Sequence, residues 1–113
     1  MHELSIAMSI AELAVEEAHK HDATSVIRVD VEIGTLSGIE TEALEFAWDV
    51  AIQGTAAEKA SLRIISVPAE AMCLDCRHSF PAGHFFAQCP NCSGFRYELV
   101  KGRELRIKSL EIE

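Results

Sequence analysis

The sequence lacks the features that mark several broad classes of protein. No apolar run approaches the roughly 20 residues that a membrane-spanning helix needs, so we expect no membrane span. The first residues contain no basic segment, and Glu3 and Glu12 interrupt their apolar character, which argues against a secretory signal peptide. We therefore expect a cytoplasmic protein whose thiols are reduced.

Positive charge is scarce as well. The chain has 10 Lys and Arg against 18 Asp and Glu, a formal net charge of −8. Domains that bind nucleic acid need a basic face, so the charge balance predicts no nucleic-acid partner. The sequence also contains no nucleophile motif, phosphate-binding loop or metalloprotease helix, and we expect a protein that is not an enzyme.

All four cysteines lie in one stretch, as two CxxC pairs separated by 12 residues. Cys73 pairs with Cys76, and Cys89 pairs with Cys92. This spacing predicts one tetrahedral zinc site of the closed, structural kind. Two disulfides, which require an oxidising compartment, and a redox-active CxxC, which opens a helix after a strand, are the alternatives.

The other residues of this stretch fit a metal-binding loop. Pro90 fixes φ inside the second turn, and Gly94 is expected to take a positive φ as the chain leaves the metal. Because four cysteines complete the coordination shell, His78 and His84 are expected to be exposed or hydrogen-bonded loop residues. A small apolar cluster around the metal is expected from three aromatic residues: Phe80, Phe85 and Phe86.

Hydrophobic periodicity predicts the order helix, strand, helix, strand, zinc segment, strand. The predicted helices cover residues 4–20 and 41–53, and the predicted strands cover 26–33, 60–67, 97–100 and 104–113. The residues expected to face the core from the first helix are Leu4, Met8, Ala11, Val15 and Ala18. Those expected from the second helix, which Thr41 is predicted to cap, are Leu44, Ala47, Trp48, Ala51 and Ile52.

These elements indicate an α+β fold. Two helices are expected to pack on a small mixed or antiparallel sheet, and the zinc-ribbon-like module is an insertion before the last strand. The predicted domains are a core of residues 1–68 plus 104–113 and a zinc-binding domain of residues 69–103.

The N-terminus offers a second candidate metal site. At His2 the imidazole, the backbone nitrogens and the terminal amine can converge in a plane, which suits Ni²⁺ or Cu²⁺. Glu3 adds a carboxylate, and Glu40 adds another if the loop of residues 34–39 folds back toward the first helix. The alternative is a solvated histidine, with Glu3 complementing the helix dipole and Glu40 preceding the second helix as a cap.

Taken together, three motifs resemble the HypA/HybF family of nickel-delivery proteins for [NiFe]-hydrogenase maturation. They are Met1-His2-Glu3-Leu4-Ser5, the stretch Glu32-Ile33-Gly34-Thr35-Leu36-Ser37-Gly38-Ile39-Glu40, and the two CxxC pairs. The likeness extends over the whole chain, through Gly54-Thr55-Ala56 to the closing Ile107-Lys108-Ser109-Leu110-Glu111-Ile112.

The resemblance implies a set of site residues and partners. His2 would be the principal nickel ligand, with adjoining backbone nitrogens and Glu3, and Glu40 stands where some members carry an aspartate. Cys73, Cys76, Cys89 and Cys92 would hold structural zinc, and nickel would be the transferred cargo. The implied partners are a HypB-type nickel GTPase and the hydrogenase large-subunit precursor, and in some bacteria members also serve urease.

Two other classes of function compete with nickel delivery. A zinc-ribbon module that binds a partner or nucleic acid would need no nickel site, and it predicts a basic face that the composition does not provide. A small metal-dependent enzyme would need an open coordination position on zinc, and four thiolates leave none.

Overall fold

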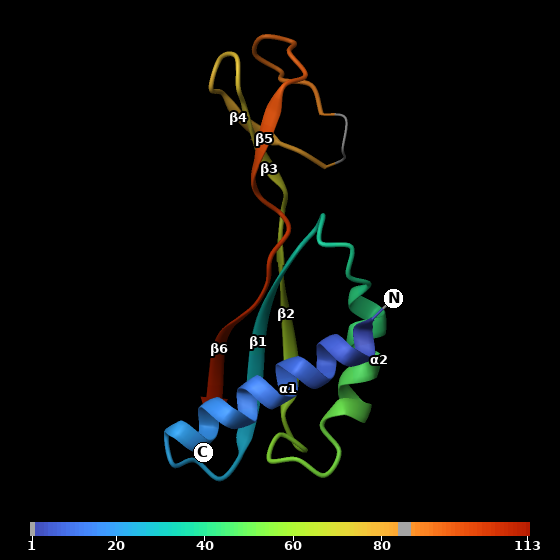
Figure 1. Ribbon diagram of the computed structural model, residues 1–113, viewed down its shortest axis with the longest axis vertical. Helices are drawn as coiled ribbons and strands as arrows, with labels where there is room; N and C mark the ends of the chain where they lie inside the picture. The colour runs from blue at the N-terminus through green and yellow to red at the C-terminus, as the bar shows by residue number, and fades with distance from the viewer. Residues whose placement is uncertain (1, 84–86) are drawn as a thin grey trace. The chain divides into compact units, whose positions relative to one another are not determined.

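The computed structural model describes residues 2–83 and 87–113. The elements in chain order are α1 (Glu3–Lys20), β1 (Val26–Gly34), α2 (Thr41–Ala51), β2 (Ser61–Val67), β3 (Glu70–Cys73), β4 (Ser79–Pro81), β5 (Tyr97–Lys101) and β6 (Leu105–Ile112), as Figure 1 shows. No helix in the described part of the chain is both long and apolar enough to cross a membrane.

The chain forms two compact units. Unit 1 contains Met1–Val31, Ile39–Ile65 and Arg106–Glu113, and unit 2 contains Glu32–Gly38 and Ser66–Leu105. Unit 2 therefore includes the loop after β1 besides the cysteine segment. The functional division at residues 68–69 and 103–104 stays a prediction.

A three-stranded sheet in the order β2-β1-β6 supports the two helices. β1 and β6 run antiparallel, because the Glu113 N–H donates to the Ser25 carbonyl at one end and the Gly34 N–H donates to the Glu104 carbonyl at the other. β2 runs parallel to β1, because the Val26 N–H donates to the Ala56 carbonyl just before β2 and the Thr35 N–H donates to the Val67 carbonyl at the end of β2. α2 lies in the crossover that connects the two parallel strands. The α+β class with a mixed sheet is confirmed.

β1 is buried more fully than its alternating pattern predicts. Val29, Val31 and Ile33 are buried as expected. Asp30 is also buried, with 4% of its surface exposed, although the pattern places it on the polar face. It is stabilised there because Ser109 and Arg28 donate hydrogen bonds to its carboxylate at 2.7 Å and 3.0 Å.

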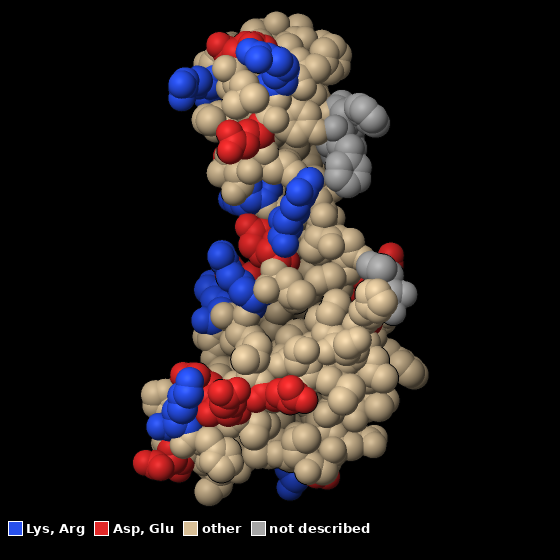
Figure 2. Space-filling view, in the orientation of Figure 1, with Lys and Arg blue, Asp and Glu red and all other residues tan. Residues whose placement is uncertain are grey.

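The buried face of α1 differs from the predicted one. Leu4 and Met8, expected in the core, are each 47% exposed. The buried positions are mostly small residues, whose size lets the helix approach its neighbours closely: Ala7, Ile10, Ala11, Ala14 and Ala18. Leu4 and Met8 instead line a groove of about 570 Å³ with Val50 of α2. Acidic side chains gather over α1 in Figure 2, where Glu12 and Glu16 are exposed.

α2 buries the face that its periodicity predicts. Leu44, Trp48 and Ile52 are at most 6% exposed. The Trp48 indole N–H donates to the Ala60 carbonyl at 3.0 Å, which satisfies its one polar group inside the core. The N-cap of α2 is Glu40 and not Thr41, which is already the first helical residue.

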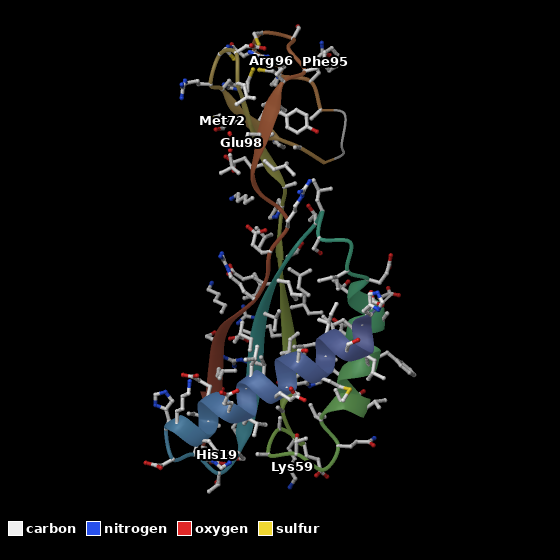
Figure 3. All side chains as sticks on the ribbon, in the orientation of Figure 1. His19, Lys59, Met72, Phe95, Arg96 and Glu98 are labelled. Carbon is white, nitrogen blue, oxygen red and sulfur yellow. The ribbon has the colours of Figure 1, made fainter. Side chains whose placement is uncertain are left out.

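Unit 2 is built on a second, antiparallel sheet in the order β4-β3-β5. Met72 on β3 is the register partner of Glu98 on β5, and both are labelled in Figure 3. Ala71 faces Phe80 across the β3–β4 pair. The sequence predicted a strand at β5 but neither β3 nor β4, whose three or four residues are too short to show periodicity.

Hydrogen bonds to other segments of unit 2 fix the loop that follows β1. The Thr35 N–H donates to the Val67 carbonyl at 3.0 Å, and the Leu36 N–H donates to the Gly102 carbonyl at 2.7 Å. The Thr35 hydroxyl accepts a bond from the Ala69 N–H at 3.1 Å. The segment thus joins the chain entering the cysteine segment to the chain leaving it.

Candidate metal centres

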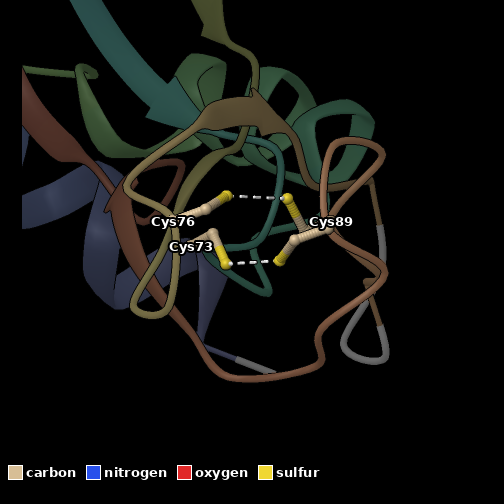
Figure 4. A group of neighbouring side chains, drawn as sticks. Cys73, Cys76 and Cys89 are labelled. Atoms are coloured by element: carbon tan, nitrogen blue, oxygen red, sulfur yellow. Dashed lines mark hydrogen bonds between the residues drawn. The ribbon is translucent and has the colours of Figure 1, made fainter.

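The four cysteine sulfurs converge as the spacing predicts. All lie within 4.8 Å of one another. Dashed lines in Figure 4 mark two sulfur–sulfur contacts, Cys73 with Cys92 at 3.5 Å and Cys76 with Cys89 at 3.6 Å. Tetrahedral zinc with Zn–S bonds of about 2.3 Å places its sulfurs about 3.8 Å apart. The donor set and its geometry fit one zinc ion, and all four cysteines are free thiols.

Each CxxC pair is shaped by the same backbone turn. In the first, the Arg77 N–H donates to the Cys73 carbonyl at 2.9 Å, and in the second the Ser93 N–H donates to the Cys89 carbonyl at 2.9 Å. Arg77 and Ser93 both take the left-handed conformation, with φ of 63° and 64°. Because the two turns have the same backbone conformation, each directs its two cysteine sulfurs toward a common point between the turns.

The prediction that Gly94 takes a positive φ is wrong, because Ser93 takes it instead. Glycine at 94 avoids tight contacts with neighbouring side chains. A Cβ atom there would lie 3.0 Å from a carboxylate oxygen of Asp75 and 3.3 Å from the sulfur of Cys92. The Gly94 carbonyl also accepts a bond from the Cys89 N–H at 2.9 Å. Gly94 therefore closes the second turn against the metal ligands.

Hydrogen bonds shift the pKa values of Cys76 and Cys92 in opposite directions. The Asn91 side chain donates to the Cys76 sulfur at 3.4 Å and, with the His78 backbone, lowers the pKa of Cys76 to about 6. A bond with the Gly94 backbone lowers the pKa of Cys92, but bonds with Cys73 and Cys76 and burial outweigh it and raise that pKa to about 12. Zinc binding at neutral pH therefore displaces protons from the cluster.

The sequence alone did not indicate the roles of three residues around the cluster: Asp75, Asn91 and Arg96. Asn91 supports the Cys76 sulfur, and Arg96 forms an ion pair with Asp75 beside the first turn. Asparagine inside a CxxC pair was a usable signal, whereas the ion pair joins positions 21 residues apart. His78 is exposed, as predicted, and Phe80 belongs to the apolar cluster. His84, Phe85 and Phe86 lie outside the described residues.

The N-terminal candidates occupy the start of both helices in unit 1. His2 precedes α1, its side chain is exposed, and its carbonyl accepts a bond from the Ile6 N–H at 2.9 Å. Glu3 is 8% exposed, and its carboxylate accepts a bond from the Glu40 N–H at 3.2 Å. The fold therefore brings Glu3 to Glu40. In Figure 1 the first turn of α1 lies beside the first turn of α2.

The two candidate sites differ in how complete they are. Within the described residues, the cysteines are the one group of three or more His, Cys, Asp or Glu side chains close enough to share an ion. His2, Glu3 and Glu40 do not form such a group through their side chains.

A small protein of two units, one of which brings four cysteine sulfurs together with the geometry of a zinc centre, belongs to the class of metal-binding proteins. Residues 1–112 match the family model described as "Hydrogenase/urease nickel incorporation, metallochaperone, hypA". The chain belongs to this HypA family, whose members are nickel metallochaperones.

Individual relatives agree with the family match. The hydrogenase maturation factor HypA of Parabacteroides distasonis is 45% identical over 113 residues, covering 100% of this chain and 98% of that protein. The factor of the same name from Acidithiobacillus ferrooxidans is 42% identical, and both chains are fully covered. The solution structure of the nickel metallochaperone HypA from Helicobacter pylori is 30% identical with a TM-score of 0.70, covering 99% of this chain and 97% of that one.

Proposed function

We propose that this chain carries Ni²⁺ to [NiFe]-hydrogenase during its maturation, with His2 as the principal ligand. The observation that carries the proposal is the exposed His2 at the start of α1, beside the Glu3–Glu40 contact, in a chain of the HypA family. The imidazole, the backbone nitrogens around His2 and a carboxylate provide the nitrogen-rich set that Ni²⁺ favours. Glu3 and Glu40 are the candidate residues that complete the site.

An exposed site suits transfer of a metal. A carrier must release its cargo, and a few ligands at a chain terminus release an ion more readily than a closed four-thiolate centre. Cys73, Cys76, Cys89 and Cys92 accordingly hold a zinc ion that stays with the protein and stabilises unit 2. This division assigns nickel to the core domain of residues 1–68 and 104–113, and zinc to residues 69–103.

Delivery of nickel requires a donor or regulator and an acceptor. We assign these roles to a HypB-type nickel GTPase and the hydrogenase large-subunit precursor, in the cytoplasm. The protein itself performs no catalysis, since its zinc ligands leave no open position and its nickel is cargo. Nucleic acid is not a partner, and the net charge of −8 supports this.

The test is a Ni²⁺ titration of untagged protein that starts at Met1, with zinc content measured alongside. The His2→Ala variant is expected to keep one zinc per chain and lose the nickel site. The matched control is His19→Ala, which removes an exposed histidine from the last turn of α1 and is expected to bind nickel normally. Nickel affinity that is unchanged in His2→Ala would refute the proposal.

A further inference from the structure

Glu3 is unusual among the acidic residues of α1. It is buried, whereas Glu12, Glu16 and Glu17 on the same helix are exposed. A carboxylate in the first turn complements the helix dipole from an exposed position, so the dipole alone does not explain burial. A buried carboxylate needs a partner, and the structure provides one in the Glu40 N–H.

The Glu3–Glu40 contact links the starts of the two helices of unit 1. It joins residues 37 positions apart, from the first residue of α1 to the N-cap of α2. The carboxylate lies at the N-terminal end of both helices, where partial positive charge from each favours a negative group. The contact therefore fixes where the Glu40 backbone, and with it the Glu40 side chain, stands relative to His2.

This geometry constrains how Glu3 can take part in nickel binding. One oxygen of its carboxylate, Oε2, accepts the Glu40 N–H, and the side chain is buried. Turning the carboxylate outward to a metal would break that bond. The exposed Glu40 side chain, in contrast, is accessible from solvent. We infer that Glu3 is a positioning residue. Its carboxylate holds Glu40 near His2 and does not ligate nickel. The inference rests on the proposed nickel site.

Two substitutions separate positioning from ligation. Glu3→Gln keeps an acceptor oxygen at the same reach but removes the charge that a nickel ligand would supply, whereas Glu3→Ala removes both. Glu12→Ala, an exposed acid on the same helix, is the control. Trp48 fluorescence and zinc content report whether each variant is folded.

Ni²⁺ affinity and the nickel absorption bands are measured for each untagged variant. We expect Glu3→Gln to bind within about threefold of the unsubstituted protein with the same spectrum. Glu3→Ala should bind about 10- to 100-fold more weakly, as loss of a group that orients metal ligands does. Equal weakening in Glu3→Gln with a shifted spectrum would show ligation and overturn the inference. Unchanged affinity in Glu3→Ala would overturn it as well.

Amide hydrogen exchange at Glu40 in nickel-free protein tests the contact separately from the nickel site. Glu3→Ala should accelerate this exchange, and Glu3→Gln and Glu12→Ala should preserve its protection. If the unsubstituted protein binds no nickel, the proposed function fails, and positioning is then judged on this exchange alone. Equal protection of the Glu40 amide in Glu3→Ala would overturn it.

Discussion

Asp30 shows how one buried carboxylate can order a sheet. Ser109 on β6 and Arg28 on β1 donate to its two oxygens, and Arg28 also contacts Glu111 at 3.3 Å. The Ser109 hydroxyl is the main cause of the lowered pKa of Asp30, and Arg28 adds to it. The folded state therefore favours the charged carboxylate. The cluster links β1 to β6 at a defined register.

Ser109→Ala is expected to lower the thermal midpoint of unit 1 by roughly 5 °C at pH 7, because it removes a hydrogen bond to a charged, buried group. Folding lowers the pKa of Asp30 below its ordinary value. The charged carboxylate therefore contributes to the stability of the folded state at pH values above the ordinary carboxyl pKa. This contribution is lost as the pH falls through the pKa of the folded state. The difference in thermal midpoint between Ser109→Ala and the unsubstituted protein should therefore shrink toward pH 3.

Trp48 fluorescence during heating checks this prediction, because Trp48 is the chain's only tryptophan and is buried in unit 1. Ser61→Ala, at an exposed position of β2, is the control and should change the midpoint little at either pH. A midpoint difference for Ser109→Ala that stays constant from pH 7 to pH 3 would contradict the role given to Asp30.

At the scale of elements, the end of β1 depends on a close crossing of two glycines. A Cβ atom on Gly34 would lie 2.1 Å from the carbonyl carbon and oxygen of Gly102. Gly102 itself has a φ of 125°, and a Cβ there would lie 2.7 Å from Ala69. Backbone atoms this close cannot move aside individually, so the crossing requires both glycines.

Gly34→Ala is expected to disrupt unit 2 around residues 32–38, with loss of the hydrogen bonds from Thr35 and Leu36. The cost should be several kcal/mol, on the order of a severe overpacking substitution. Hydrogen exchange at the Leu36 amide measures the loss. Gly83→Ala is the matched control, since a Cβ at Gly83 meets nothing within 4 Å and should leave this amide protected. Protection retained in Gly34→Ala would show that the crossing can relax.

Periodicity predicted the helices and the long strands but not which face of α1 is buried. Apolar spacing favoured Leu4 and Met8, yet the core accepts the face rich in alanine. A hydrophobicity pattern measures how apolar a face is, and it does not measure how closely a neighbouring element approaches. The buried Asp30 was missed for a similar reason, because its partner Ser109 is 79 residues away in the sequence.

The candidate sites were predictable to different degrees. The cysteine cluster followed from spacing alone, since two CxxC turns leave few ways to arrange four sulfurs. The meeting of Glu3 and Glu40 required folding of the intervening chain, and their separation of 37 residues carries no local signal. The commitment of the Glu3 carboxylate to a backbone N–H appears only in the three-dimensional structure.

At the scale of the whole molecule, the two units differ in how they are stabilised. The buried side chains of unit 1 include large apolar ones, such as Leu44, Val29 and Trp48. Among the described residues of unit 2, the buried cluster consists mainly of small side chains: Ala69, Ala71, Cys73, Phe80, Ala82, Ala87 and Cys89. The partly buried side chains of Leu36, Cys76, Tyr97 and Leu99 pack against it. A cluster of this size rarely holds a fold without a metal or a cross-link.

Removal of zinc is therefore expected to unfold unit 2 and leave the core of unit 1 intact. Chelated protein should lose hydrogen-exchange protection at the Cys73 and Cys89 amides, which donate to the His78 and Gly94 carbonyls. Trp48 emission should stay constant. Cys76→Ser should reproduce the effect with a lower zinc content, whereas His78→Ala, which removes an exposed imidazole beside the cluster, should not. Protected Cys73 and Cys89 amides in zinc-free protein would mean that the small apolar cluster suffices. In that case the cysteines would not be the structural element that their closed geometry indicates.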